Sequence, residues 1–118
     1  MPSLRYAILR HDGIADPHFD LMFETYPGSA LATWRSPVWP IESPVELTRL
    51  KDHRREYLQF EGEISGNRGN VSRVDDGACE VRVGENNVWQ ITFANNSRIR
   101  TLILSLKTGN TWMARTEL

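Results

Sequence analysis

The stretch ACEVRVGENNVWQITFA, residues 78–94, contains two short runs rich in valine, isoleucine and aromatic residues on either side of a polar tetrapeptide. Runs of this composition are typical of β-strands. The tetrapeptide Gly-Glu-Asn-Asn supplies residues that adopt the positive φ angles of a tight turn. The stretch therefore predicts two antiparallel strands joined as a hairpin.

The same alternation of strand and turn continues in both directions along the chain. After the hairpin, Asn-Asn-Ser and Lys-Thr-Gly-Asn precede the runs RIRTLILSL and TWMARTEL, and before it Asp-Asp-Gly follows NVSRV. The first half adds LRYAILRH (residues 4–11), HFDLMFE (18–24) and LATWR (31–35). Short strands at this regular spacing predict an all-β, mainly antiparallel fold. We expect a small closed or nearly closed β-barrel, because closure removes exposed strand edges.

One segment departs from the strand pattern. SPVELTRLKDHRREYLQ, residues 43–59, is the only helix-like stretch of the chain. Ser43 could cap a helix there, with Pro44 at its first position. We therefore predict one short helical segment beside the barrel.

Length and composition limit the possible functions. A chain of 118 residues predicts a single domain, residues 1–118. Its net charge of −1 is no signature of bulk nucleic-acid binding, so any basic patch must be local. The one cysteine, Cys79, cannot form an internal disulfide; we interpret it as a packed hydrophobic residue in a reducing compartment. The first apolar run is too short for a signal peptide or membrane span, so we expect a cytoplasmic protein without membrane contact.

The run HFDLMFE places unlike residues on its two faces. Period-two alternation directs the side chains of Phe19, Leu21 and Phe23 to one face, and those of His18, Asp20, Met22 and Glu24 to the other. His11 ends the preceding strand, and the Asp-Pro turn at residues 16–17 brings it towards His18 if the two strands are neighbours. Two histidines and one carboxylate could then form a metal site with open coordination positions. The alternative is a solvated outer face, and Glu24 is about 20 Å along the strand from His18, better placed for an ion pair or turn contact.

Three further polar features could contact an anion. His53 and Tyr57 are four residues apart, so one helical turn would place them side by side; the alternative is a solvated turn whose tyrosine packs on the sheet. The glycine-bounded loop SGNRGN surrounds Arg68, and such loops approach anions through backbone N–H groups, although this one lacks the spacing of a phosphate-binding P-loop. Arg35, in TWRSP, is either a phosphate contact or a stacking or ion-pairing residue.

Three blocks together resemble a known family. ILRHDGIADPHFDLMFE, then ATWRSP, then DHRREYLQFEGEISGNRGNV are similar, in that order, to the phosphoesterase module of bacterial DNA ligase D. The resemblance covers residues 4–75 in motif detail, and the remaining residues only in strand character.

This resemblance implies a β-barrel with a crescent groove and a manganese-dependent activity, with zinc as another possible metal. The activity removes a 3′ ribonucleoside and then a 3′ phosphate from a DNA primer end. It implies metal ligands His11, His18 and Asp20, and contacts from His53 and Tyr57 to the reacting phosphate. The expected partners are nucleic-acid 3′ ends and, in DNA repair, a ligase or polymerase protein.

The chain departs from the family pattern in three places. The family has a phosphate-directed arginine two residues after the metal-binding aspartate, where this chain has Met22. The loop between the two histidines is one residue longer. The lysine of the Trp…Pro-Lys-Gly-Pro block is missing, and TWRSPVWP offers Arg35 instead. Because methionine cannot form a bidentate charged contact, phosphate chemistry could be weakened, lost, or restored by Arg35 or Arg68.

Three hypotheses follow. The first is a metal-dependent phosphoesterase acting on nucleic-acid 3′ ends. The second is a catalytically reduced relative that binds such ends or a repair partner. The third is an unrelated small metal barrel, such as a non-haem iron enzyme with the same histidine–aspartate arrangement. On the first hypothesis we expect Met22 to line the same groove as Asp20.

Overall fold

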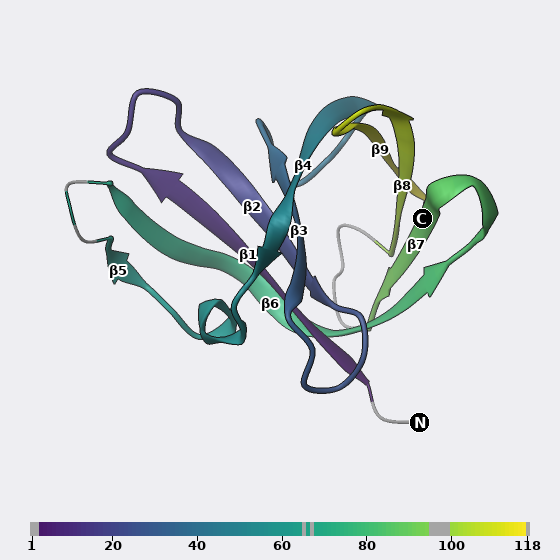
Figure 1. Cartoon of the computed structure of the whole chain (residues 1–118), viewed down its shortest axis with the longest axis horizontal. Coiled ribbons are helices and arrows are strands. Elements are labelled where there is room, and N and C mark those ends of the chain that lie inside the picture. Colours follow the sequence, from purple (N-terminus) through teal and green to yellow (C-terminus); the bar gives the residue numbers. More distant parts are fainter. Residues whose placement is uncertain (1–2, 65, 67, 95–99, 118) are drawn as a thin grey trace.

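The protein forms one antiparallel sheet that closes on itself. The computed structural model describes residues 3–64, 66, 68–94 and 100–117 (Figure 1). Within these ranges the strands are β1 (Leu4–Asp12), β2 (His18–Glu24), β3 (Leu31–Ser36), β4 (Val45–His53), β5 (Gly62–Glu63), β6 (Asn70–Val83), β7 (Val88–Phe93), β8 (Thr101–Thr108) and β9 (Thr111–Glu117).

Closure depends on β6, which is long enough to pair with three other strands. The sheet order is β1-β2-β3-β4-β9-β8-β7-β6-β5, and β6 also pairs with β1. This last pairing closes the barrel, and β5 remains as a short strand beside β6 (Figure 1). The predicted all-β antiparallel barrel is confirmed.

The predicted hairpin at residues 78–94 forms between β6 and β7. Its turn places Asn86 and Asn87 at φ of 60° and 56°, as the sequence indicated. The β8–β9 hairpin turns at Gly109, within the predicted Lys-Thr-Gly-Asn segment. The predicted turn at residues 95–97, the first two residues of RIRTLILSL and the final leucine lie outside the described residues.

The turn predicted at Asp-Asp-Gly, residues 75–77, is wrong. β6 runs through these residues, because all of β1 pairs with β6 and Asp75–Gly77 lie within the paired part. The pairing has a bulge opposite Ile8 and Leu9. The Gly77 backbone leaves space for the ring of Tyr6, since a Cβ there would lie 3.4 Å from Tyr6 Cε1. Long-range strand pairing therefore overrides the local turn preference of Asp-Gly.

The short helical segment predicted within residues 43–59 forms only at Arg55–Leu58, and its predicted start at Ser43 and Pro44 is wrong. Residues Val45–His53 form β4, between β3 and β9, and only Arg55–Leu58 form a short 3-10 turn, η1. Leu47 is buried in the barrel while its neighbours Glu46 and Thr48 are exposed, which is strand periodicity. A second 3-10 turn, η2, spans Glu85–Asn87, and no helix within the described ranges has the length and apolar character needed to cross a membrane.

The barrel interior holds the main hydrophobic core. Leu21 and Phe23 lie in it, fully buried, and Phe19 packs against it, which confirms the inward direction of that face of β2. Cys79 lies in the same core, and burial raises the pKa of its thiol to about 12. The interpretation of Cys79 as a packed hydrophobic residue is therefore confirmed. The buried members of this core are Tyr6, Ile8, Leu21, Phe23, Ala32, Trp34, Ile41, Leu47, Cys79, Trp89, Ile91, Phe93, Leu102, Leu104, Trp112 and Ala114.

A second, smaller core lies on the outer face of β1, β2 and β3. The chain after β4 crosses this face, and Tyr57, Leu58, Phe60 and Ile64 pack on it; the buried members are Ala7, Leu9, Met22, Leu31 and Val71. Met22 does share a strand face with Asp20, but it is fully buried in this cluster and does not line a groove. The expectation that Met22 lies beside the phosphate is therefore wrong, because the η1 segment covers its part of the strand.

Candidate metal centre

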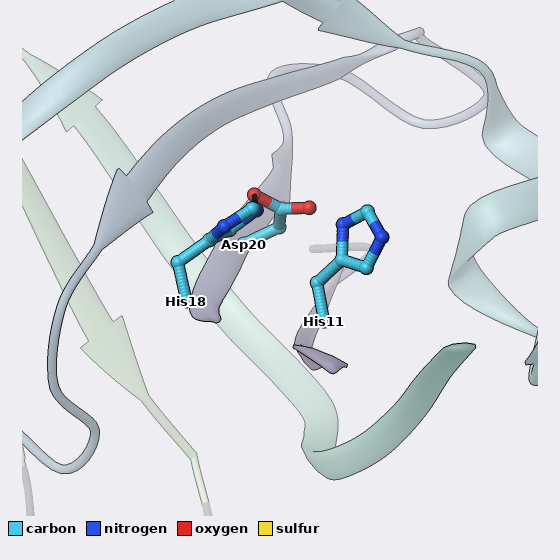
Figure 2. Close-up of side chains that lie close together, drawn as sticks. All are labelled: His11, His18 and Asp20. Atoms are coloured by element: carbon cyan, nitrogen blue, oxygen red, sulfur yellow. Dashed lines mark ion pairs between the residues drawn. The ribbon is translucent and has the colours of Figure 1, made fainter. Parts of the chain in front are cut away.

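Strand register brings His11, His18 and Asp20 together. His11 and His18 are the last paired residues of the β1–β2 hairpin, directly opposite each other. Directly opposed residues project to the same face of a sheet, and Asp20 follows His18 on that face after one pleat. The ring centroids of His11 and His18 are 5.0 Å apart. One possible ligand atom from each of the three residues lies within 4.8 Å of the others. Figure 2 shows the three side chains pointing to a common point.

Two atoms in this cluster are buried and face each other. His18 Nδ1 donates a hydrogen bond of 2.8 Å to the Asp16 carbonyl, which leaves a lone pair on its Nε2. That Nε2 lies 3.4 Å from Asp20 Oδ1. Within the described part of the chain, neither atom has a hydrogen-bond partner. Two buried acceptors without a donor are unfavourable, and a bound cation would remove that cost.

The spacing of these atoms fits a divalent ion. Two ligands, each about 2.1 Å from an ion and separated by a tetrahedral angle, lie about 3.4 Å apart, the observed distance between His18 and Asp20. His11 is half-buried and donates from Nε2 to the Arg68 carbonyl at 2.6 Å, so its Nδ1 is the available ligand atom. In Figure 2 one ring nitrogen of His11 faces Asp20 and the other points away.

A pocket of about 160 Å³ opens beside this cluster. It lies between the outer face of β1–β4 and the segment that carries η1. Its walls combine polar and apolar side chains: Leu9, His11, Asp20, Arg35, Leu50, His53, Tyr57, Ile64 and Val71. Five residues that the sequence singled out therefore line one pocket, namely His11, Asp20, Arg35, His53 and Tyr57. Arg68 does not line it.

Arg35 is the cationic residue of the pocket. It pairs with Asp20 in the β2–β3 register, so the two side chains share a face. Arg35 is exposed, and its guanidinium forms no hydrogen bond or ion pair with any residue that the structure describes. It therefore presents an uncompensated positive charge next to the cluster.

His53 and Tyr57 lie side by side, as predicted, although no α-helix connects them. His53 ends β4 and Tyr57 lies in η1, and their ring centroids are 5.5 Å apart. His53 Nδ1 donates to the Lys51 carbonyl at 3.1 Å, which leaves Nε2 for a ligand in the pocket. The imidazole, when protonated on both nitrogens, and the phenol can thus both donate to an oxygen of the same anion.

Glu24 is an ion-pair and turn residue, as the sequence indicated. Its carboxylate pairs with Arg55 and accepts hydrogen bonds from the backbone N–H groups of Arg5, at 2.6 Å, and Gly28, at 3.2 Å. Burial raises its pKa, but the hydrogen bonds from Arg55, Gly28 and Arg5 and the charge of Arg55 outweigh that effect, so the pKa lies below its usual value. Sequence reasoning missed Arg55, which fixes η1 to the end of β2; the expected ion pair of Glu24 was the one signal in the sequence that a cation lies nearby.

We expect Glu24→Gln to lower the free energy of unfolding by about 1–3 kcal/mol at pH 7, because Gln cannot form the charged hydrogen bonds. The stabilisation from Glu24 is present above its unfolded pKa of about 4.3 and disappears as the pH falls through its lower folded pKa. The two proteins should therefore converge in stability as the pH falls below the folded pKa of Glu24, as measured by urea unfolding at several pH values. Glu46→Gln, at an exposed ion pair with Lys107, is the matched control and should change stability by less than about 1 kcal/mol. A constant difference between pH 3 and 7 would contradict this account.

The chain matches no protein-family model, and no curated protein matches its sequence. Fold and site together define a small antiparallel barrel with two histidines, one aspartate and one arginine around a pocket on its outer face.

Proposed function

We propose that this protein is a metal-dependent phosphoesterase that acts on the 3′ ends of nucleic acid in DNA repair, removing a 3′ ribonucleoside or 3′ phosphate. The observation that carries the proposal is one pocket. His11 and Asp20 of the cluster line it together with Arg35, His53 and Tyr57. Metal ligands, a cation and two hydrogen-bonding rings are the groups that phosphoryl transfer requires, because catalysis there is mainly positioning and charge stabilisation.

Each residue has a defined part in this proposal. His11, His18 and Asp20 hold manganese or zinc, which when bound polarises a phosphate oxygen and lowers the pKa of a bound water. Arg35 binds non-bridging phosphate oxygens and replaces the arginine that the family has at the position of Met22. His53, when its ring is protonated on both nitrogens, would donate the Nε2 proton to the leaving oxygen and become neutral, and the Tyr57 hydroxyl would stabilise the developing negative charge.

Specificity for an end follows from pocket size. A volume of about 160 Å³ admits a terminal phosphate or sugar group but not a paired base. Nucleic acid would then be recognised by shape and backbone contacts without base reading. Oxygen chemistry at an iron ion would need additional room for a co-substrate, which makes the non-haem iron hypothesis the weaker one.

The test is incubation with primer–templates that carry a 3′ phosphate or a 3′ ribonucleotide, with manganese and with chelator. We expect manganese-dependent release of both groups and no release with chelator. Arg35→Ala should lower kcat/KM by about 10–100-fold, since a charge-assisted contact contributes about 1.5–3 kcal/mol. Arg115→Ala, an exposed strand arginine paired with Glu117, is the control and should leave the rate unchanged. Binding of primer ends without release would favour the catalytically reduced relative.

We also expect manganese or zinc to raise the melting temperature. A ligand that binds only the folded state stabilises it by about 2.7 kcal/mol at a hundredfold excess over its dissociation constant. His18→Ala removes a ligand and should abolish the shift, as followed by differential scanning calorimetry. A shift of unchanged size in the variant would place the metal elsewhere.

A further inference from the structure

Arg68 and Gly69 lie directly behind His11. The Arg68 carbonyl accepts the His11 Nε2–H bond at 2.6 Å. Gly69 follows with φ of +86°, in the left-handed region that favours glycine, and its own carbonyl accepts a hydrogen bond of 2.8 Å from the backbone of Ile64. The chain therefore turns at Gly69 so that one carbonyl faces the imidazole.

Close packing at Gly69 leaves no space for a side chain. A Cβ there would lie 2.1 Å from the Asp12 carbonyl oxygen, 2.9 Å from Ile14 Cγ2 and 3.2 Å from His11 Nε2. The turn between β1 and β2 makes this close approach, since a Cβ on Gly13 would lie 3.2 Å from Gly69 Cα. Two glycines thus let two backbone turns meet beside a proposed metal ligand.

We propose that Arg68 and Gly69 are positioning residues of the metal centre. The Arg68 carbonyl holds the hydrogen of His11 on Nε2 and fixes the ring so that Nδ1 faces Asp20, and Gly69 lets that carbonyl reach the ring. A histidine ligand commonly donates its other N–H to such an acceptor, and loss of the acceptor lowers metal affinity by about 10–100-fold. The role assigned to Arg68 therefore belongs to its backbone and not to its guanidinium. The inference rests on the proposed metal site.

The test compares Gly69→Ala with Gly66→Ala and Arg68→Ala. Gly66 is the matched control, because its φ of +79° imposes the same backbone strain while, among the described residues, a Cβ there would meet only Arg68 Nε, at 3.9 Å. Arg68→Ala removes the guanidinium and keeps the carbonyl. If Gly69→Ala does not fold, Gly13→Ala can replace it. A Cβ on Gly13 would displace Gly69 less, and should lower cobalt affinity to an intermediate extent.

Two readouts separate positioning from folding. In the metal-free protein, imidazole ¹⁵N chemical shifts should show the His11 hydrogen on Nε2 in the wild type, Gly66→Ala and Arg68→Ala, and a mixture of tautomers in Gly69→Ala. With cobalt as the probe, Gly69→Ala should bind about 10–100-fold more weakly and show shifted d–d absorption bands, while the two controls stay within about twofold of the wild type.

Several results would overturn the proposal. They are an unchanged His11 tautomer and cobalt affinity in Gly69→Ala, an equal loss in Gly66→Ala, or an equal loss in Arg68→Ala. If the wild type binds no cobalt but Gly69→Ala still loses the His11 tautomer, the positioning of His11 stands and the proposed function fails.

Discussion

Asp20→Asn should lower the manganese-dependent rate of 3′-phosphate removal by about a thousandfold, the largest effect that we expect. The substitution keeps the shape of the side chain and removes the only negative charge among the three proposed ligands. Loss of about 4 kcal/mol of transition-state stabilisation corresponds to that factor, and a metal ion acting on a phosphoryl oxygen contributes several kcal/mol. The loss is measured as kcat/KM on a 3′-phosphorylated primer–template.

Asp12→Asn is the matched control for this variant. Asp12 ends β1 next to His11, but its carboxylate is exposed and paired with Arg10 at 2.9 Å. It should retain the wild-type rate within about threefold, since an exposed ion pair contributes about 1 kcal/mol or less. If the activity is retained in Asp20→Asn and lost in Asp12→Asn, the metal lies at the outer rim of the hairpin and not at the proposed site.

Met22→Arg should destabilise the protein by about 3 kcal/mol or more. Met22 is fully buried in a cluster with Ala7 and Leu9 that the η1 segment covers, so a guanidinium there would lose its water without gaining a partner. Urea unfolding at pH 7 measures the loss. Met22→Leu conserves volume and polarity, and should cost less than about 1.5 kcal/mol.

The same variant distinguishes the two possible positions of residue 22. If its side chain lined the groove, Met22→Arg would keep its stability and raise phosphate turnover by tenfold or more. A Met22→Arg protein with wild-type stability and higher phosphate turnover would therefore contradict the burial seen in the structure. It would assign the phosphate contact to residue 22 and not to Arg35.

Strand periodicity was sufficient to predict that His11, His18 and Asp20 lie together. Alternation in HFDLMFE places His18 and Asp20 on one face, and the Asp-Pro turn makes β1 and β2 neighbours, so His11 follows from register. These features depend on contacts close in sequence, which local patterns describe well.

Features that depend on distant segments could not be predicted. Met22 is buried by residues 57–64, which approach the outer face of the barrel only after β4 has been placed. The helix-like reading of β4 was wrong for a similar reason. The guanidinium of Arg49, on this strand, lies 4.3 Å from the ring centroid of Trp34 and 5.1 Å from that of Trp89, contacts between distant segments that no local pattern shows.

The site shows the same division between local and long-range information. The sequence indicated Arg68 as a charged group, whereas the structure uses its carbonyl, and no side-chain pattern encodes a backbone acceptor. Arg35 was one of two candidates for the missing phosphate contact, and the cross-strand pairing with Asp20 distinguishes it from Arg68.

The most direct test of the central claim measures manganese binding and turnover on the same preparation. Electron paramagnetic resonance gives the dissociation constant of manganese, and phosphate release from a 3′-phosphorylated primer–template gives the manganese concentration for half-maximal rate. If His11, His18 and Asp20 hold the catalytic ion, the two concentrations agree within about twofold in the wild type and rise together in His18→Gln, by tenfold or more. Manganese that binds with no phosphate release, or release whose metal dependence is unchanged in His18→Gln, would contradict the account.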